Sequence, residues 1–325
     1  RLTEYCLERG LMINRCGKLV VARDESELAG IDELLRRGKV NDVELQSVTA
    51  AEAREIEPRI RTYERAIFSP TTSSVDPQEV MRTLVADAQA AKIEIRTGTS
   101  YEGRDGSSVR TSGGRIEAGY VVNAAGLYAD KVARDFGFSQ NHRILPFKGV
   151  YLYADEDEKL RTNIYPVPNL ANPFLGVHFT VTMKGRTKIG PTAIPAFWRE
   201  QYAGLSGFRP REFAEIVGRE GMLLLRNDFN FRRLAWTEIR KYRRKHLIHL
   251  ASSMIQDMNP ARYNHWGRAG IRAQLLDLRT HKLEMDFRIE GDSRSMHVLN
   301  AVSPAFTCSM PFAAYVVNAI EKAAG

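Results

Sequence analysis

Two hydrophobic periods alternate along this chain, one typical of strands and the other of amphipathic helices. Residues 18–22 form an apolar run that predicts a strand, and 24–37 have the spacing of a helix. Thr49 followed by Glu52 is a capping box and predicts a short helix, because each side chain can accept a hydrogen bond from the other's backbone N–H. Asp76-Pro77 predicts the start of a longer helix, since Asp is a common N-cap and Pro fits the first turn.

The second half of the chain continues this mixture of strands and helices. Its predicted elements are a strand at 120–123, a helix at 128–136, β-rich segments at 144–153 and 174–191, a broken basic helical region at 211–258, a strand at 296–299 and a closing helix from Ser303. Residues 75–135 and 265–325 are therefore typical of α/β structure, whereas 140–200 are typical of an antiparallel sheet. This order predicts a nucleotide-binding domain interleaved with a β-rich substrate domain.

Length and composition are those of a globular protein with a substantial core. The chain has 325 residues, of which 43% are hydrophobic and 26% charged. Its three cysteines, Cys6, Cys16 and Cys308, are far apart and odd in number. That argues against a disulfide framework and a zinc knuckle, and it predicts a cytoplasmic protein.

The positive charge is concentrated in one region. The net charge is +8, and residues 226–245 contain eight Lys/Arg against two Asp/Glu. Such a region is either a solvated helix face or a surface that attracts anionic partners, whether nucleic acid, lipid headgroups or a dicarboxylate. The longest uncharged run, 298–320, contains too many polar residues and prolines for a membrane span. The chain starts with Arg1 in a stretch typical of the middle of a helix, so we expect that a segment precedes it.

The strongest local motif is an apolar strand that ends in small residues and turns at once into a helix. Val122-Asn-Ala-Ala-Gly-Leu-Tyr-Ala-Asp130 has Ala124, Ala125 and Gly126 at the turn. Small side chains allow a ligand to approach the backbone closely, and a helix N-terminus favours an anion. The same pattern also occurs in ordinary tight turns, so both interpretations remain open.

A second motif lies at the predicted closing helix. In Val298-Leu-Asn-Ala-Val-Ser-Pro-Ala-Phe-Thr307, Ser303 fits an N-cap and Pro304 fits the first turn. The free N–H groups at the start of such a helix suit an electron-rich ring edge. An ordinary capped helix is the alternative.

Cationic and aromatic side chains supply the remaining candidates. Arg272 follows the glycine at position 270 and could bind a carboxylate through two hydrogen bonds, and Lys148 could pair with an anion. Tyr165 and His178 could donate hydrogen bonds or relay a proton. Each of these residues also has a purely structural interpretation, above all the lone histidine on a strand.

Several nucleotide and metal motifs are absent from the sequence. No Gly-x-Gly-x-x-Gly, P-loop, His-Glu-x-x-His or Gly-x-Ser-x-Gly occurs. His246 and His249 lie in the basic region without a nearby set of ligands, so we interpret them as structural and predict no metal.

Taken together, the segments resemble the flavin-dependent amine and hydroxy-acid oxidoreductases of the D-amino-acid oxidase type. Within this superfamily they are most similar to the L-2-hydroxyglutarate dehydrogenase/oxidase family. The segments that carry the resemblance follow the family's order and lie at 15–22, 122–130, 144–149, 164–168, 173–180, 189–193, 270–274 and 297–305. The Asn-Ala-Ala-Gly turn is shared by many flavoproteins, whereas Tyr-Pro-Val-Pro and Phe-Leu-Gly-Val-His-Phe-Thr are much more specific to this family.

The resemblance implies a fold, a cofactor and a reaction. The implied fold is α/β (α+β), with an incomplete FAD/NAD(P)-binding Rossmann-like domain at 71–140 and 261–325 and an antiparallel substrate domain at 141–260, preceded by substrate-domain and connecting segments at 1–70. The cofactor is FAD, and the reaction is hydride transfer from C2 of L-2-hydroxyglutarate to flavin N5, which gives 2-oxoglutarate.

The resemblance also assigns roles to individual residues. His178 and Arg272 are the catalytic candidates, and Lys148, Tyr165 and Arg272 are the candidates for substrate binding. The residues placed beside the cofactor are Ala124, Ala125, Gly126, Gly270, Asn300, Ala301, Ser303, Pro304, Ala305 and Phe306.

The sequence departs from the family at several points. Family members begin with a strand, a glycine-rich turn and a helix that hold the ADP part, followed by a histidine segment near the flavin, and neither is present in these 325 residues. Val150 stands where an acidic residue is usual, and Phe306 replaces a smaller one. We therefore expect these 325 residues alone to bind FAD poorly.

Two other classes of function remain open. A related flavoenzyme could act on glycine, sarcosine or glycerol 3-phosphate, which becomes the better interpretation if only one of Lys148 and Arg272 points into the site. A non-enzymatic basic module would bind nucleic acid or membrane with a steep salt dependence, and we expect no nucleic acid partner. Oxygen and a membrane quinone both remain open as electron acceptors, and the basic region is compatible with peripheral contact to the inner membrane.

Overall fold

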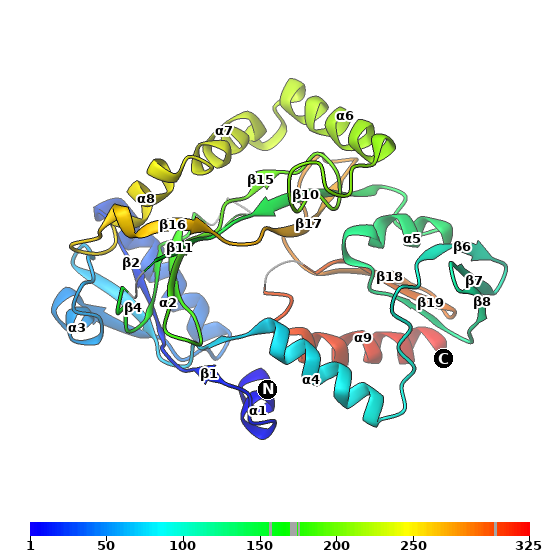
Figure 1. Ribbon diagram of the computed structural model, residues 1–325, viewed down its shortest axis with the longest axis horizontal. Coiled ribbons are helices and arrows are strands. Elements are labelled where there is room, and N and C mark those ends of the chain that lie inside the picture. Colours follow the sequence, from blue (N-terminus) through cyan, green and yellow to red (C-terminus); the bar gives the residue numbers. More distant parts are fainter. Residues whose placement is uncertain (156–157, 170–173, 175, 302–303) are drawn as a thin grey trace.

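The computed structural model describes residues 1–155, 158–169, 174, 176–301 and 304–325. Its largest element is an eight-stranded sheet, on the left of Figure 1. In spatial order the strands are β16 (Tyr263–Trp266), β11 (Leu152–Ala154), β14 (Thr187–Gly190), β13 (His178–Val181), β12 (Asn163–Pro166), β2 (Lys18–Val21), β4 (Arg65–Ser69) and β3 (Gln46–Thr49). All neighbours are antiparallel except β2 and β12.

The two faces of this sheet differ in what covers them. One face carries Leu19, Ile164 and Phe179 and packs against α8 (Arg244–Ser252) and α3 (Ala50–Ile56). The other face is covered by α2 (Leu28–Val40) over β2, β4 and the end of β12, where Val20, Ile67 and Tyr165 pack in one cluster with helix residues such as Ile31. Successive strand residues point to opposite faces of a sheet. Apolar residues at every second position therefore line the face that carries Leu19, Ile164 and Phe179, and this face is core along its whole length.

A second sheet links the first to the rest of the molecule. It has the order β15 (Ile194–Pro195), β10 (His142–Gly149) and β17 (Gly270–Asp277), with all pairs antiparallel. Helices α6 (Pro210–Arg226) and α7 (Phe231–Lys241) cover one face through Leu223 and Phe231. Helix α5 (Ala129–Asp135) packs on the other face against Ile144 and Leu275.

A third sheet lies on the right of Figure 1 and carries both candidate cofactor motifs. Its order is β18 (Arg288–Gly291), β19 (Ser295–Asn300) and β9 (Val121–Asn123), and β9 runs parallel to β19. The C-terminal helix α9 (Ser309–Ala324) contacts β19 and lies below this sheet in Figure 1, in the same lower part of the view as α4 (Pro77–Ala90).

The remaining elements are short. A meander is formed by β6 (Tyr101–Asp105), β7 (Ser108–Thr111) and β8 (Gly114–Glu117), and a two-stranded ribbon by β1 (Ile13–Asn14) and β5 (Ser74–Val75). Helix α1 (Leu2–Glu8) is tied to α4 by a hydrogen bond from Tyr5 Oη to Asp87. Short 3₁₀ turns occur at Glu25–Glu27, Gly126–Tyr128, Asp228–Asn230 and Pro260–Arg262.

Most of the predicted elements are confirmed. Thr49 and Glu52 form the capping box of α3, and Asp76 caps α4 by accepting a hydrogen bond of 2.8 Å from the Gln78 N–H. The mixed α/β fold with an antiparallel β-rich part is also confirmed.

The predicted start of the closing helix is wrong. Ser303 lies outside the described residues, and Pro304 begins a series of turns rather than a helix. The Cys308 N–H donates to the Pro304 carbonyl over 3.1 Å, and α9 begins only at Ser309. The N–H groups of Ala305, Phe306 and Thr307 therefore do not form the end of a helix, because the chain turns once more before α9.

Candidate active site

The open part of the large sheet carries a group of polar side chains. Strand register places them together, since Tyr165 stands beside His178 and Thr180 lies directly opposite Lys188. On the same face lie Lys18, Tyr151, Tyr153, Tyr165, His178, Thr180 and Lys188, of which Tyr165 also packs against the residues of α2. We call these seven residues the polar sheet face. The opposite face of the sheet is an apolar core, so hydrophobic packing does not account for the polar side chains gathered here.

His178 lies at the centre of the polar sheet face and is almost fully buried. Its ring stacks on that of Tyr165, with centroids 3.9 Å apart and planes 13° from parallel. Nδ1 is 2.9 Å from the Gly176 carbonyl oxygen, which can only accept a hydrogen bond, so Nδ1 carries the proton and Nε2 is left as an acceptor. Burial lowers the pKa of His178 to about 4, so the ring is neutral at pH 7.

Two lysines flank this histidine. The Lys18 ammonium lies 5.5 Å from the centre of the Tyr165 ring, and the Lys188 ammonium lies 4.2 Å from that of Tyr151. Both are near enough to His178 to lower its pKa further, in addition to the effect of burial. Burial also lowers the pKa of each lysine, and neither forms an ion pair with a carboxylate of the described chain. The face therefore presents two partly desolvated cations that lack an anion.

Burial raises the pKa of both Tyr165 and Tyr151. Their hydroxyl groups consequently remain protonated at neutral pH and can donate hydrogen bonds.

Lys148 and Arg272, the two candidates for the substrate's carboxylates, lie on opposite sides of their sheet. In the antiparallel ladder of β10 and β17, Phe147 is the direct partner of Arg272 and Lys148 is the partner of Ile271. Direct partners share a face and neighbours along a strand alternate, so Lys148 and Arg272 point to opposite sides of the sheet. Two neighbouring strands place them close in the fold, but on different surfaces.

Arg272 lies on the side of the sheet that faces α6 and α7. Its guanidinium group is 5.5 Å from the ring centre of Phe174, which in turn contacts Phe147. Burial lowers the pKa of Arg272, and its Nε has no hydrogen-bond partner within the described chain. Lys148 is half-buried on the opposite side, which it shares with Ala273.

The predicted strand-to-helix turn forms as expected and is open to solvent. Ala124, Ala125 and Gly126 are exposed, and Gly126 has φ +54° with no atom within 4 Å of where a Cβ would stand. The Asn123 side chain holds the turn, because it accepts from the Ala125 N–H over 3.1 Å and donates to the Ala129 carbonyl over 2.8 Å. A 3₁₀ turn separates this point from α5, which begins at Ala129, one residue after the predicted start at Tyr128.

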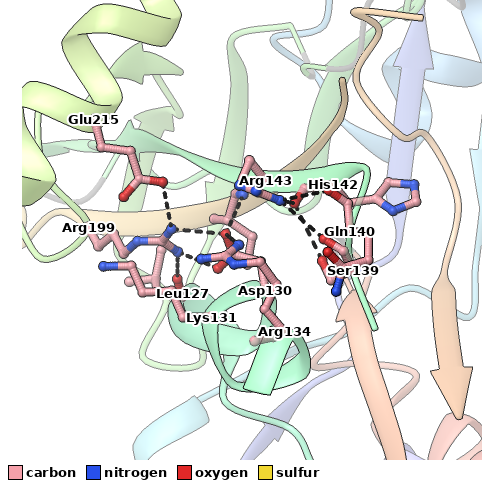
Figure 2. A network of polar contacts seen from close by, with 12 residues as sticks. Leu127, Asp130, Lys131, Arg134, Ser139, Gln140, His142, Arg143, Arg199 and Glu215 are labelled. Carbon is pink, nitrogen blue, oxygen red and sulfur yellow. Dashed lines mark hydrogen bonds and ion pairs between the residues drawn. The ribbon is translucent and has the colours of Figure 1, made fainter. Parts of the chain in front are cut away.

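A buried ion pair between Arg199 and Asp130 holds the helix that follows this turn, as Figure 2 shows. Arg199, which is fully buried, donates to Asp130 Oδ1 over 2.7 Å and to Oδ2 over 3.0 Å, and also to the Leu127 carbonyl. Asp130 further accepts from the Ile144 N–H over 3.2 Å. The last residue of the motif thus fixes α5 to β10 and to the segment after β15.

An apolar cavity of about 420 Å³ adjoins the open turn. It lies between β9, β19 and α9, and four predicted cofactor residues line it, namely Ala124, Gly126, Ala301 and Ala305. Small side chains around an open, glycine-containing turn fit the close approach of a dinucleotide to the backbone. The residues present are therefore compatible with the cofactor that the sequence resemblance implies.

Other predicted cofactor residues lie elsewhere or serve the fold. Asn300 is fully buried, and its side chain binds the Leu275 N–H and the carbonyls of Glu284 and Asp286, so only its backbone is left for a ligand. Gly270 is exposed at the end of β17 and does not line the cavity, whose β17 residue is Ala273. Ala125, Pro304 and Phe306 are near the cavity in sequence but are not part of its lining.

Sequence reasoning missed Lys18, Lys188 and Tyr151. The signal was a lysine at an inward position of a strand whose other residues are apolar, in Lys18-Leu-Val-Val and in Thr187-Lys-Ile-Gly. A solvated surface gives the same pattern, so only the pairing of distant strands shows that these side chains meet.

Comparison with known proteins agrees with this geometry. The chain is 32% identical over 351 residues to a mitochondrial L-2-hydroxyglutarate dehydrogenase of Bos taurus, covering 98% of this chain and 73% of that protein. It is also 32% identical over 336 residues to L-2-hydroxyglutarate dehydrogenase of Escherichia coli O17:K52:H18, covering 98% and 76%.

Solved structures and a family model extend the comparison. An FAD-bound L-α-glycerophosphate oxidase of Mycoplasma pneumoniae is similar with a TM-score of 0.70 at 18% identity, over 96% of this chain and 74% of that one. The model of the FAD dependent oxidoreductase (DAO) family matches residues 1–319. The chain therefore belongs to the DAO family of FAD-dependent oxidoreductases, and its cofactor is FAD.

Proposed function

We propose that this protein oxidises L-2-hydroxyglutarate to 2-oxoglutarate. Relatives that align over nearly the whole chain carry the name L-2-hydroxyglutarate dehydrogenase. The observation that carries the proposal is the pair Lys18 and Lys188 on either side of His178, both half-buried and without an anionic partner among the described residues. A substrate with two carboxylates supplies one negative charge for each lysine, so both desolvated cations are neutralised on binding.

His178 is suited to take the proton of the substrate's C2 hydroxyl group. Its neutral ring offers Nε2 as the acceptor, and the Gly176 carbonyl holds the tautomer that makes this possible. The Tyr165 ring stacked on it fixes the orientation of the imidazole. FAD supplies the acceptor for the hydride that leaves C2.

The geometry supports Lys148 more strongly than Arg272 as a contact for the substrate. Lys148 shares a side of the sheet with Ala273, which lines the cavity beside the open turn, and we propose it as an additional contact for an anion. Arg272 faces α6 and α7 beside the Phe174 ring, so we do not propose it as a contact for the same substrate. We therefore propose the polar sheet face, with Lys148 as an additional contact, as the dicarboxylate site.

The test compares two substrates and three variants. Visible absorption of the FAD-loaded protein is recorded without oxygen, before and after L-2-hydroxyglutarate is added, and we expect the flavin band to bleach. Lys18→Met and Lys188→Met should each raise KM for this dicarboxylate at least about tenfold, since each removes one charge-assisted contact. Lys184→Met, at an exposed position in the turn before β14, is the control and should leave KM unchanged.

L-Lactate, which has a single carboxylate, separates the roles of the two lysines. The lysine that binds the distal carboxylate should matter for L-2-hydroxyglutarate and not for L-lactate. Bleaching by glycine, sarcosine or glycerol 3-phosphate, but not by L-2-hydroxyglutarate, would instead support the related flavoenzyme that acts on one of these compounds. Unchanged KM values in both lysine variants would contradict the assignment of the polar sheet face.

For the electron acceptor we propose a quinone reached from an anionic membrane. Helix α7 presents Arg233, Trp236 and Arg240 at spacings of three and four residues, so they share one helix face. Trp236 is 66% exposed, and the neighbouring Leu225 at the end of α6 is 80% exposed. Exposed Trp and Leu among arginines are typical of a helix that lies on an anionic membrane surface. No helix within the described ranges is both long and apolar enough to cross a membrane.

A further inference from the structure

A second cluster of ionisable side chains lies at the other end of β10 and β17. His142, the first residue of β10, is the direct cross-strand partner of Asp277, the last residue of β17. Glu284 lies beside them, and ligand atoms of the three residues are all within 4.8 Å of one another. Lys148 is six residues along β10, about 20 Å away at the rise of an extended strand, so this cluster is separate from the residues proposed to bind substrate.

His142 is the unusual member of this cluster. Its side chain is 5% exposed, and both ring nitrogens are buried without a hydrogen-bond partner in the described chain. Nε2 is 3.8 Å from Glu284 Oε1, and Nδ1 is 3.6 Å from Glu290 Oε1. These distances are too long for hydrogen bonds, and a buried imidazole with neither nitrogen satisfied is costly.

The separations fit ligands around a small divalent cation. Zinc binds imidazole nitrogen and carboxylate oxygen at about 2.0–2.2 Å, so two of its ligands in tetrahedral geometry are about 3.3–3.6 Å apart. The 3.8 Å between His142 Nε2 and Glu284 Oε1 is close to this range. The upper bound of 4.8 Å for the whole set exceeds it by about 1.2 Å, so the side chains rotate toward one another when a metal binds.

We propose that His142, Asp277 and Glu284 bind a divalent transition metal ion, with zinc as the preferred metal. One imidazole and two carboxylates form a mixed nitrogen and oxygen donor set, for which zinc binds more tightly than manganese. Calcium and magnesium prefer sites made of oxygen atoms alone, and should bind weakly.

A fourth residue orients the histidine. Glu290 faces Nδ1, and its own carboxylate accepts the Ser139 N–H over 2.8 Å and contacts Arg288 over 3.3 Å. With Nε2 on the metal, Nδ1–H points at Glu290, which is the usual partner arrangement of a metal-bound histidine. The backbone of Glu284 is held as well, because its N–H donates to the Leu275 carbonyl and its own carbonyl accepts from Gln274.

The site has a path of entry and a local competitor. A polar hollow of about 190 Å³ is lined by His142 and Glu290, together with Arg279 and Arg288. Arg279 contacts Asp277 Oδ2 over 3.2 Å, but its side chain is 64% exposed and can turn into solvent when a metal binds. The two arginines are already paired with Asp277 and Glu290, so they do not leave the hollow with an unopposed positive charge.

The metal would join two sheets. His142 and Asp277 belong to the β10–β17 ladder, whereas the orienting Glu290 is on β18 of the third sheet. A bound ion that contacts only the folded chain stabilises it in proportion to occupancy. We therefore assign the site a structural role and not a part in hydride transfer.

The test is a zinc titration of the FAD-loaded protein after treatment with a chelator. Calorimetry should give one zinc ion per chain, and zinc should raise the thermal unfolding midpoint. His142→Gln and Glu284→Gln should weaken zinc binding at least about tenfold, and Glu290→Gln by about 10- to 100-fold while the stoichiometry stays at one. His265→Gln is the matched control, because it removes an exposed histidine that contacts Asp155 over 2.9 Å.

Folding of the variants is checked by measuring their melting without metal. A Glu284→Gln protein that melts like the parent without zinc, and gains nothing from zinc, supports the proposal. Absence of zinc uptake, uptake that His142→Gln and Glu284→Gln leave intact, or uptake that only His265→Gln removes would overturn it. Flavin bleaching by substrate is independent of these outcomes, so failure of the metal site and failure of the proposed reaction are distinguishable.

Discussion

Several buried ionisable residues make the stability of the fold depend on pH, and histidine and glutamate do so in opposite directions. Burial lowers the pKa of His178 and of His297 to about 4. Between pH 4 and 6.5 the unfolded chain therefore binds more protons at these two positions than the folded chain does. Each histidine then costs stability as the pH falls through this window, by about 1.4 kcal/mol per pH unit. Glu220 on α6 has the opposite effect, because it costs stability as the pH rises.

Glu220→Gln should stabilise the protein at pH 8 and not at pH 4.5. Burial raises the pKa of Glu220 to about 8, and its Oε1 has no partner in the described chain. The folded state keeps the proton while the unfolded state loses it above pH 4.5, so the stability of the parent declines as pH rises from 4.5 to 8. Glutamine removes this loss, and we expect a gain of roughly 1–3 kcal/mol in urea unfolding at pH 8.

The comparison isolates Glu220, because both proteins keep the same histidines. Glu117→Gln, at an exposed position of β8, serves as the control and should change stability little at either pH. An equal effect of Glu220→Gln at pH 4.5 and pH 8 would show that its carboxyl group ionises normally in the folded protein.

At the scale of elements, the Arg199–Asp130 pair determines how the open turn is held. It joins α5, β10 and the segment after β15, and both side chains are fully buried. Arg199→Met leaves the buried Asp130 with Arg134, at 3.3 Å, as its remaining ion-pair partner in the described chain, and should lower the free energy of unfolding by about 3–5 kcal/mol. The double variant with Asp130→Leu should regain much of this loss, because no buried charge remains.

Denaturant unfolding measures both variants, and titration with FAD shows whether the turn keeps its shape. Arg209→Met removes an arginine that is 60% exposed, and it should behave like the parent. A single variant as stable as the parent would mean that water solvates Asp130 when Arg199 is lost.

The same scale shows what the sequence could predict. Asp76-Pro77 and Ser303-Pro304 carry the same local signal, yet only the first starts a helix at its proline. Cap residues define which backbone groups a turn can satisfy, whereas packing decides whether a helix continues. Helix α9 begins at Ser309, and its residues Phe312 and Val316 line the cavity. The partnership of Lys148 with Ile271 likewise depends on a strand register set by residues more than a hundred positions apart.

At the scale of the whole molecule, exposed apolar and basic residues gather on the helices at the top of Figure 1. Helices α6 and α7 run along this edge, away from α4 and α9. The polar sheet face could not be foreseen either, since it is assembled from five strands that the chain reaches between residues 18 and 190. The family, its fold and its cofactor were accessible from contiguous motifs, because such motifs keep their residues together without any knowledge of pairing.

The proposed membrane contact is tested with vesicles. Trp236→Ala combined with Arg240→Gln should reduce sedimentation with anionic phosphatidylglycerol vesicles at least about tenfold, since each arginine near such a surface contributes about 1 kcal/mol and the indole adds buried area. Both side chains are exposed on α7, so the fold should not change. Binding should also fall steeply between 50 and 300 mM salt, roughly as screening shortens the reach of surface charges.

Arg54→Gln on α3 is the matched control, because it removes an exposed arginine from another part of the surface. If the protein binds neutral phosphatidylcholine vesicles equally well, the arginines of α7 do not select an anionic membrane. If it binds neither, electrons leave the reduced flavin for a soluble acceptor, and the charge on α7 serves only its solvation. A loss of anionic binding in the α7 variant alone, with substrate bleaching intact, would place the contact on α7 and separate it from the chemistry at His178.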